Sequence, residues 1–224
     1  MNIGGFNIKE LRVTGSGKIS ASLDFSENVT VIVGPSNTGK SYVFQCIKYL
    51  LGATKKPKKI DQSKGYDKAF IELKLSSGST ETLYRSLLGG NILLYKCSIS
   101  EVSHYENEPE TLLADSQPTK THRTISEYLN ALSGLKNTKV RKNAAGETEN
   151  VGFWMMRQLS LIDEVSIIKE ESPLLGGQYT QETKEKSFVR LLISGMDDSS
   201  IVPKPKAKIV HNREGRLEII EALI

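Results

Sequence analysis

Short apolar stretches separated by polar turns open the chain, and they predict strands rather than helices. Between residues 6 and 33 we expect three strands, of which residues 19–25 (ISASLDF) alternate most regularly between apolar and polar side chains. Residues 29–33 (VTVIV) are β-branched and apolar almost throughout, as is typical of a strand that is buried on both faces of a sheet. The pattern therefore predicts a buried strand at 29–33.

After residue 39 the apolar spacing becomes that of an amphipathic helix. Val43, Ile47, Leu50 and Leu51 fall on one stripe, and Gly52 supplies the stop. Together with the preceding strand, this spacing predicts a strand, a loop and a helix in that order.

A second apolar region follows a basic linker at residues 54–59 (TKKPKK). Residues 68–75 alternate between apolar and polar side chains, and residues 81–99 contain further apolar runs. Turn residues separate these runs at 77–78 and at 89–91. The pattern predicts an antiparallel meander.

Two later helices are marked by their ends, whereas residues 101–121 are polar and acidic without a period, which indicates a surface loop. Thr124 and Glu127 have the spacing of a capping box, and the helix that they begin should end at Gly134. A second helix within residues 181–195 should turn three apolar residues inward and stop at a glycine: Phe188, Leu191, Leu192 and Gly195.

Composition fits an ordinary globular protein, since 38% of the 224 residues are hydrophobic and 25% are charged. The formal net charge is only +4, so any surface for nucleic acid must be local. Cys46 and Cys97 form neither a zinc nor a disulfide pattern, which favours a cytoplasmic location. We expect neither a secretion signal nor a membrane-spanning segment, and hence no membrane partner.

The turn between the predicted strand and helix matches the pattern G-x-x-x-x-G-K-[ST] at every fixed position. In this arrangement backbone N–H groups and the helix dipole form an anion site, Lys40 reaches the β- and γ-phosphates, and the Ser41 hydroxyl ligates Mg²⁺. The chain should therefore bind a nucleoside triphosphate with Mg²⁺. The predicted nucleotide-binding residues are Gly34, Pro35, Ser36, Asn37, Thr38, Gly39, Lys40, Ser41 and, in the first helical turn, Tyr42.

Residues 5–53 resemble the start of an ABC-type ATPase head of the SMC/SbcC/RecF kind. The resemblance continues through IELKL and ETLYRSL to SFVRLLISGMDDSS at 187–200, which looks like the end of an N-terminal head lobe before a coiled-coil arm. It implies an α/β fold of the P-loop NTPase class, with a mixed sheet, an antiparallel β subdomain and flanking helices. It also implies that the ligand is ATP with Mg²⁺.

On this resemblance residues 1–200 form the head lobe, and residues 201–224 form a linker and the start of a coiled-coil arm. A longer helix would then bury the apolar residues Leu217, Ile220, Leu223 and Ile224. A short helix packed on the body is the alternative. Many such heads carry Gly where this chain has Asn37, but Asn tolerates a positive φ better than most residues.

A complete head of this kind also needs a Q-loop Gln, a signature segment, an apolar strand that ends in Asp-Glu (Walker B) and a switch His. QLSLIDE offers Asp163 and Glu164 as a Walker B pair, and both LLGGQ at 174–178 and LSGLK at 132–136 look like a signature. Their order differs from the family order, which favours an N-terminal lobe over a compact complete head. Asp163 and Glu164 would then be a helix-start or loop pair.

In such a lobe the segment MMRQLSLIDE looks like the Q-loop region, with Gln158 facing Mg²⁺ and the attacking water. A polar residue at a strand edge is the alternative. Lys40 and Gln158 are thus the expected catalytic residues, and Ser41 and Gln158 the expected metal ligands. Arg12 resembles a basic residue that these heads place near the nucleotide, and Arg85 could be another; an ordinary sheet-edge Arg is the alternative for each.

The resemblance further implies partners. Each head would be completed by its own C-terminal lobe, ATP would be held between two heads, and residues 1–224 alone would hydrolyse little. DNA is an implied partner, with a nuclease or effector subunit, in DNA repair, maintenance or anti-phage defence; basic clusters at 55–59 and 136–143 would contact DNA or carry solvated linker charge. Two other functions stay open: an ATP-gated module that signals without turnover, and an unrelated P-loop enzyme.

Overall fold

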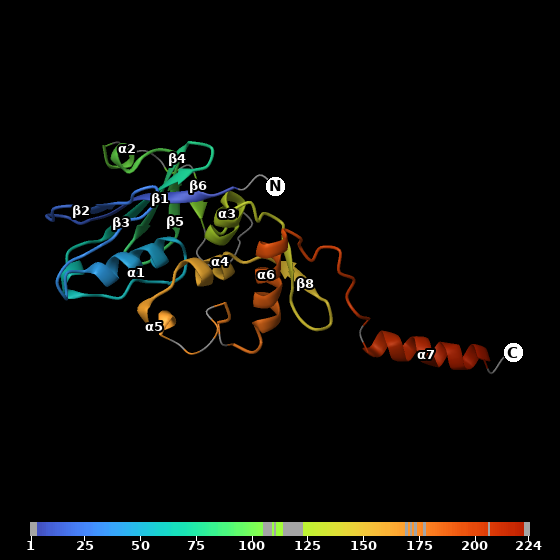
Figure 1. Ribbon diagram of the computed structural model, residues 1–224. Helices are drawn as coiled ribbons and strands as arrows, with labels where there is room; N and C mark the ends of the chain where they lie inside the picture. Colours follow the sequence, from blue (N-terminus) through green and yellow to red (C-terminus); the bar gives the residue numbers. More distant parts are fainter. Residues whose placement is uncertain are drawn as a thin grey trace. The chain divides into compact units, whose positions relative to one another are not determined.

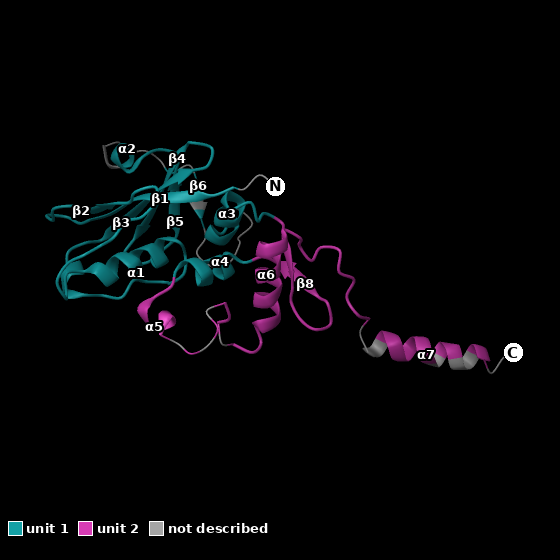
Figure 2. Ribbon diagram, viewed as in Figure 1, with its two compact units in different colours: residues 1–136, 152–161 teal, residues 137–151, 162–224 magenta. Residues whose placement is uncertain are grey.

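The computed structural model describes residues 4–104, 109, 111–113, 123–168, 170, 172, 174–176, 178–205 and 207–221 (Figure 1). It divides into two compact units (Figure 2). Unit 1 comprises residues 1–136 and 152–161, and unit 2 comprises residues 137–151 and 162–224. The domain boundary expected at residue 200 stays a prediction.

Unit 1 is built on a six-stranded sheet in the order β2-β1-β3-β4-β5-β6, in which every neighbouring pair is antiparallel. The hairpins that join β3 to β4 and β4 to β5 turn where the glycines predicted, so the meander is confirmed. The strands are β1 (Phe6–Thr14), β2 (Ala21–Asp24), β3 (Lys68–Leu75), β4 (Thr80–Ser86), β5 (Ile92–Tyr95) and β6 (Thr111–Leu113).

One face of this sheet carries the main core of unit 1. Helix α1 (Lys40–Leu50) packs against β3 and β4, and α3 (Ile125–Leu132) packs against α4 (Phe153–Ser160). Because strand side chains alternate in direction, every second residue of the meander enters this core. Its fully buried members include Ala69, Ile71, Leu73, Leu83, Ile92, Cys46, Tyr49, Leu50 and Leu129.

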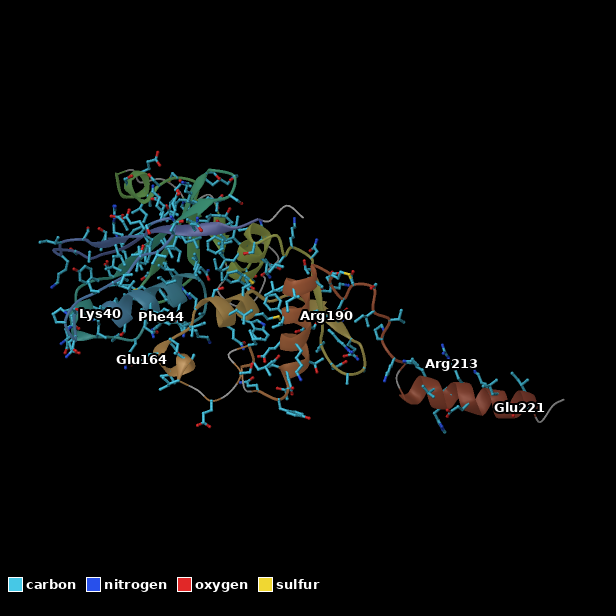
Figure 3. All side chains as sticks on the ribbon, viewed as in Figure 1. Lys40, Phe44, Glu164, Arg190, Arg213 and Glu221 are labelled. Atoms are coloured by element: carbon cyan, nitrogen blue, oxygen red, sulfur yellow. The ribbon has the colours of Figure 1, made fainter. Side chains whose placement is uncertain are left out.

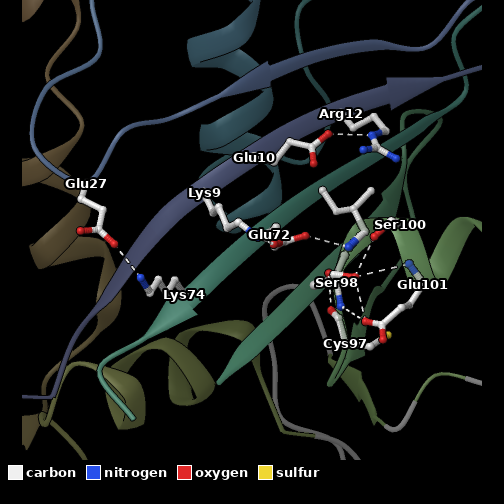
Figure 4. Close-up of polar contacts among 12 residues, drawn as sticks. Lys9, Glu10, Arg12, Glu27, Glu72, Lys74, Cys97, Ser98, Ser100 and Glu101 are labelled. Atoms are coloured by element: carbon white, nitrogen blue, oxygen red, sulfur yellow. Dashed lines mark hydrogen bonds and ion pairs between the residues drawn. The ribbon is translucent and has the colours of Figure 1, made fainter. Parts of the chain in front are cut away.

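The other face of the sheet is fastened by polar contacts (Figure 4). Glu72, only 2% exposed, accepts a hydrogen bond from Lys9 Nζ at 2.6 Å and one from the Ile99 backbone N–H at 2.8 Å. The second bond fixes the start of α2 (Ile99–His104) on β3. The hydrogen bond to Glu72 also raises the pKa of Lys9. A buried carboxylate is thereby paired, as burial of a charge requires.

The C-terminal end of α1 is held by two arginines. Arg85 is 1% exposed, donates to the backbone carbonyls of Tyr49 at 3.1 Å and Thr54 at 3.3 Å, and stacks over the Tyr49 ring at 4.3 Å. Arg157 of α4 donates to the Leu51 carbonyl at 2.8 Å. Cations at this end complement the helix dipole and satisfy carbonyls that the helix leaves unpaired.

The described residues of unit 2 form a short hairpin and three helices: β7 (Lys139–Arg141), β8 (Thr148–Asn150), α5 (Glu164–Ile167), α6 (Glu182–Ser194) and α7 (Ala207–Glu221). Asp198, 2% exposed, links hairpin and α6 by accepting from the Arg141 backbone N–H at 2.8 Å, from the Ser187 hydroxyl and from Arg190. No helix in the described ranges has the length and apolar character that crossing a membrane requires.

Several predicted elements are confirmed by the structure. The amphipathic helix after residue 39 is α1, and the Thr124–Glu127 capping box opens α3 with both of its hydrogen bonds. Gly195 ends α6 in the left-handed conformation, with φ 70°. These elements depend on local residue spacing and on capping residues, and both can be read directly from the sequence.

Residues 29–33 are the main correction, because they form no strand and pair with none of the described strands. Val29 and Val31 are each 75% exposed and Val33 is 84% exposed, so the predicted burial is wrong. A strand becomes buried in a sheet only when neighbouring strands pair with it, and residues 29–33 have no such partner among the described strands. The expected mixed sheet is not formed either: the described ladders are all antiparallel, although the α/β class of the fold is confirmed.

Three smaller expectations also fail. The stretch 101–121, expected to be a loop, includes β6 and the end of α2; other residues of the stretch lie outside the described ranges. Leu192 is 46% exposed rather than inward, whereas Phe188 and Leu191 are buried as expected. In residues 19–25 only the segment of β2 is a strand, and Ile19, which precedes it, is 91% exposed.

Candidate functional site

The loop at residues 34–39 enters α1 through two left-handed residues. Asn37 has φ 61° and Gly39, the N-cap of α1, has φ 89°, whereas Thr38 between them has no positive φ. Such alternation turns successive backbone N–H groups to one side and makes a concave anion site. We call this anion site, formed by the backbone of residues 34–39, the phosphate cradle. A Cβ on Gly34 would lie 3.2 Å from Thr38 Oγ1, so a side chain there would narrow the cradle.

Lys40 lies at the start of α1 (Figure 3), and its side chain is folded back over the loop. Its Nζ donates to the Gly34 carbonyl at 2.6 Å and to the Pro35 carbonyl at 2.5 Å. Thr38 Oγ1 also donates to the Pro35 carbonyl, at 2.8 Å. Lys40 Nζ also donates to Thr38 Oγ1 at 3.4 Å. The loop therefore carries one positive charge at its centre, held by neutral acceptors that phosphate oxygens could replace.

The N-terminus of α1 is suited to an anion. Its N-cap is Gly39, which has no side chain to cap the helix; its first turn contains no acidic residue, and Ser41 in that turn is exposed. The positive end of the helix dipole is thus not offset by its own first turn. A small hydroxyl beside the phosphate cradle is also the group that Mg²⁺ takes from such a loop. The residues present therefore fit a triphosphate with Mg²⁺.

A cavity of about 260 Å³ adjoins the loop. It is bounded by the β1–β2 hairpin, by the first turns of α1 and by residues 60–66, and Thr38 and Gly39 belong to both the loop and the cavity wall. Most of the wall is apolar. The lining residues are Leu11, Val13, Ala21, Ser22, Leu23, Thr38, Gly39, Tyr42, Val43, Cys46, Ile60, Gln62, Ser63 and Tyr66.

Two ionisable groups of the cavity wall stay neutral over the physiological range. Burial raises the pKa of Tyr42 to about 12, with Cys46 adding to the shift. Burial likewise raises the pKa of the Cys46 thiol to about 12. Tyr42 is hydrogen-bonded with Ser63 and Cys46, so its hydroxyl is directed to the cavity wall rather than to the phosphate cradle.

Arg12 and Arg85 are not brought to the loop. The neighbours of Arg12 on β1, Leu11 and Val13, line the cavity, so strand alternation directs Arg12 to the opposite face, where its Nε donates to Glu10 at 2.7 Å. Arg85 lies at the C-terminal end of α1, about 16 Å from the loop along an 11-residue helix. For Arg85 the suggested place beside the nucleotide is wrong.

Gln158 lies on α4, so the strand-edge alternative for it is wrong. Its neighbour Arg157 binds the Leu51 carbonyl, which places α4 at the end of α1 that is remote from the loop. The structure therefore does not bring Gln158 together with Lys40 and Ser41. Its assignment to Mg²⁺ and water stays a prediction.

The segments that resemble the Walker B and signature motifs of an ABC head have local structural roles. Asp163 is the N-cap of α5 and accepts from the Ser166 N–H at 2.9 Å, so the helix-start interpretation is confirmed and a Walker B strand at this place is wrong. LSGLK starts at Leu132, the last residue of α3, and its Ser133 is the C-cap of that helix. In LLGGQ the Gly176 N–H donates to Glu185 at 2.9 Å.

The two basic clusters differ. Lys55, Lys56, Lys58 and Lys59 are exposed. In the second cluster the Arg141 guanidinium is occupied within its own hairpin, where it donates to the carbonyls of Asn143 at 3.0 Å and Ala144 at 2.9 Å. Arg141 is therefore a structural part of its hairpin.

Sequence reasoning missed Gln62 and Tyr66. Gln62 Nε2 donates to the Asn37 carbonyl of the loop at 2.6 Å, and Tyr66 forms part of the cavity wall. Neither lies in a recognisable motif, and Gln62 is 25 positions from its partner. Only the turn signal of Gly65 marks this segment in the sequence.

Comparison with known proteins adds two findings. A family model described as AAA domain matches residues 6–194. A solved structure from work on ATP-driven dimerization and DNA-stimulated activation of SMC ATPases is similar at 17% identity over 42% of this chain and 74% of that chain, with a TM-score of 0.30. A TM-score this low carries no argument about the present chain. No curated protein matches the chain.

Proposed function

The chain belongs to the family of AAA domains, which are ATP-binding ATPase domains, and we propose that it holds ATP and Mg²⁺ at residues 34–42 as one half of an active site. The observation that carries this proposal is the loop itself, with Lys40 over the cradle and an uncapped helix behind it. When bound, Mg²⁺ would neutralise charge on the phosphates. Binding and positioning are what the residues of this chain supply.

Four residues of the site have defined parts in this proposal. Lys40 exchanges its two backbone carbonyl acceptors for oxygens of the β- and γ-phosphates, and the new bonds are stronger because both partners are charged. Ser41 offers its hydroxyl to Mg²⁺. Gly34 and Gly39 keep the cradle open to the phosphate chain.

The neighbouring cavity would take the nucleoside. It shares Thr38 and Gly39 with the loop, so a nucleotide whose phosphates lie in the cradle can extend directly into it. Its apolar wall suits the faces of a planar base, and the Ser22 side chain adds a polar group to the wall. ATP-versus-GTP competition would show whether the cavity selects adenine.

The other half of the active site would come from a C-terminal lobe. Support for this part is the exposed apolar segment 29–33, which leads into the loop and pairs with none of the described strands. Strands of that lobe would pair with it and bury it, and a second head would close over the γ-phosphate. Gln158 would reach Mg²⁺ and water only once the lobes are assembled.

A DNA-acting role is the wider setting that we propose. The exposed cluster of Lys55, Lys56, Lys58 and Lys59 could contact DNA phosphates. Such contacts weaken steeply with salt because they release counterions. Replacing the four lysines by Gln should therefore reduce both DNA affinity and its salt dependence; unchanged affinity would remove these residues from the proposal.

Mg-ATP binding by the purified chain, measured by titration calorimetry, tests the site. Lys40→Ala should weaken binding about ten- to a hundredfold, because a charge-assisted contact to phosphate is lost. Lys48→Ala is the matched control: Lys48 lies two turns further along α1, over the Phe44 ring at 5.2 Å. Equal losses in both variants, or no binding by the unmodified chain, would contradict the proposed site.

A further inference from the structure

One contact joins the loop to a segment that no motif marks. Gln62 Nε2 donates to the Asn37 backbone carbonyl at 2.6 Å. Asn37 is one of two residues other than Gly that have a positive φ in the described part of the chain, the second being Asn137. The contact thus falls on the strained residue of the loop.

The turn that carries Gln62 is anchored on both sides. Within the 3-10 turn η1 (Asp61–Ser63), Ser63 Oγ donates to the Ile60 carbonyl at 2.7 Å, and Ser63 is hydrogen-bonded with Tyr42 of α1. Three residues further on, the Tyr66 hydroxyl donates to the Ile19 carbonyl at 3.0 Å, which ties the segment to the β1–β2 turn. Gln62 therefore projects from a fixed base.

The direction of this hydrogen bond matters for phosphate binding. In a planar trans peptide, the C=O of one residue and the N–H of the next point in opposite directions. Holding the Asn37 carbonyl toward Gln62 consequently turns the Thr38 N–H away from Gln62. It also holds Asn37 in the left-handed conformation, which a residue with a Cβ adopts less readily than Gly does.

We propose that Gln62 is a positioning residue for the triphosphate: its side chain keeps the Asn37–Thr38 peptide in the orientation that binds phosphate. This inference rests on the proposed function, since it assumes that the loop binds ATP. A glycine at position 37 would make the hydrogen bond from Gln62 largely unnecessary, because Gly adopts a positive φ readily. The side chain acts on the loop and not on the reacting atoms.

Gln62→Met tests the inference, because Met has similar length and cannot donate the hydrogen bond. Mg-ATP affinity should fall about three- to tenfold, the usual effect of one hydrogen bond. The thermal midpoint without nucleotide should not change, because the side chain is exposed. Gln45→Met, the same change within α1 and outside the cavity wall, is the control and should bind ATP like the unmodified chain.

The same pair of measurements in an Asn37→Gly background separates positioning from other roles. There Gln62→Met should cost less than half as much affinity, because Gly adopts a positive φ without penalty. An equal loss in both backgrounds, no loss in either, a loss in the control or a fall in the midpoint without nucleotide would overturn the inference. If the unmodified chain and Lys40→Ala both fail to bind ATP, the proposed function fails, and the inference with it; the other outcomes leave the proposed function standing.

Discussion

Residues 69–73 of β3 and residues 29–33 before the loop are alike in sequence and opposite in environment. Both are short runs rich in apolar side chains, AFIEL and VTVIV. Ile71 is 0% exposed, whereas Val31 is 75% exposed. The difference lies in the neighbours: β3 has β1 and β4 on its edges and α1 on one face, and residues 29–33 have no partner among the described strands.

This comparison shows what an apolar run does and does not predict. An apolar run predicts that the segment will be buried, but it does not predict which residues will bury it. For β3 the neighbours are within residues 6–86. For 29–33 they are not among the described residues, whereas the helix on the other side of the loop packs against β3 and β4. The loop thus joins an exposed segment to a packed helix.

The largest effect should come from matched truncations of the two runs. Ile71→Ala should lower the free energy of unfolding by about 3 to 4 kcal/mol, because it leaves a cavity in a closed core. Val31→Ala should change it by no more than about 0.5 kcal/mol, since the side chain is already in solvent. Urea denaturation of both variants measures the contrast. Equal destabilisation would show that 29–33 is buried in the chain itself.

A smaller loss should follow from removing the buried cation that closes the far end of α1. Arg85→Met keeps the apolar contact with Tyr49 but leaves the carbonyls of Tyr49 and Thr54 without this donor. The free energy of unfolding should fall by about 2 to 3 kcal/mol. Arg12→Met, on the half-open face near β2, should cost less than about 1 kcal/mol. Reversal of this order would contradict the packing described for α1.

The smallest effect concerns the cavity thiol. Since burial raises the pKa of Cys46 from its ordinary value of 9.0 to about 12, the unfolded chain releases this proton at a lower pH than the folded chain. Stability should therefore fall as the pH rises from about 9 toward 12. In reducing buffer the unmodified chain should lose about 1 kcal/mol more between pH 8 and pH 10 than Cys46→Ala does. Parallel declines would mean that the thiol is accessible to water.

The sequence predicted elements whose signals are local. The capping box of Thr124 and Glu127, the stop at Gly195 and the alternation of β3 and β4 each specify their own element. The 34–41 pattern likewise predicted the cradle, with Asn37 at positive φ as its chemistry allows. In each case the residues that carry the signal also form the structure.

The remaining features depend on contacts between distant segments. β6 has only three residues, and it exists because β5 offers an open edge. Gln62 contacts Asn37 only after the chain has folded around α1. The direction of the Arg12 side chain depends on which face of β1 lines the cavity. The exposure of 29–33 could not be predicted either, because the run itself is typical of a buried strand.

Turnover by a strictly monomeric sample at saturating Mg-ATP tests the central claim most directly. The chain would hold the phosphates at Lys40 and Ser41, while the groups that complete hydrolysis would come from a C-terminal lobe and a second head. Phosphate release by the monomer should therefore not exceed that of Lys40→Ala, even when calorimetry shows the site saturated. Lys40-dependent turnover by a sample that light scattering shows to be monomeric would contradict this account.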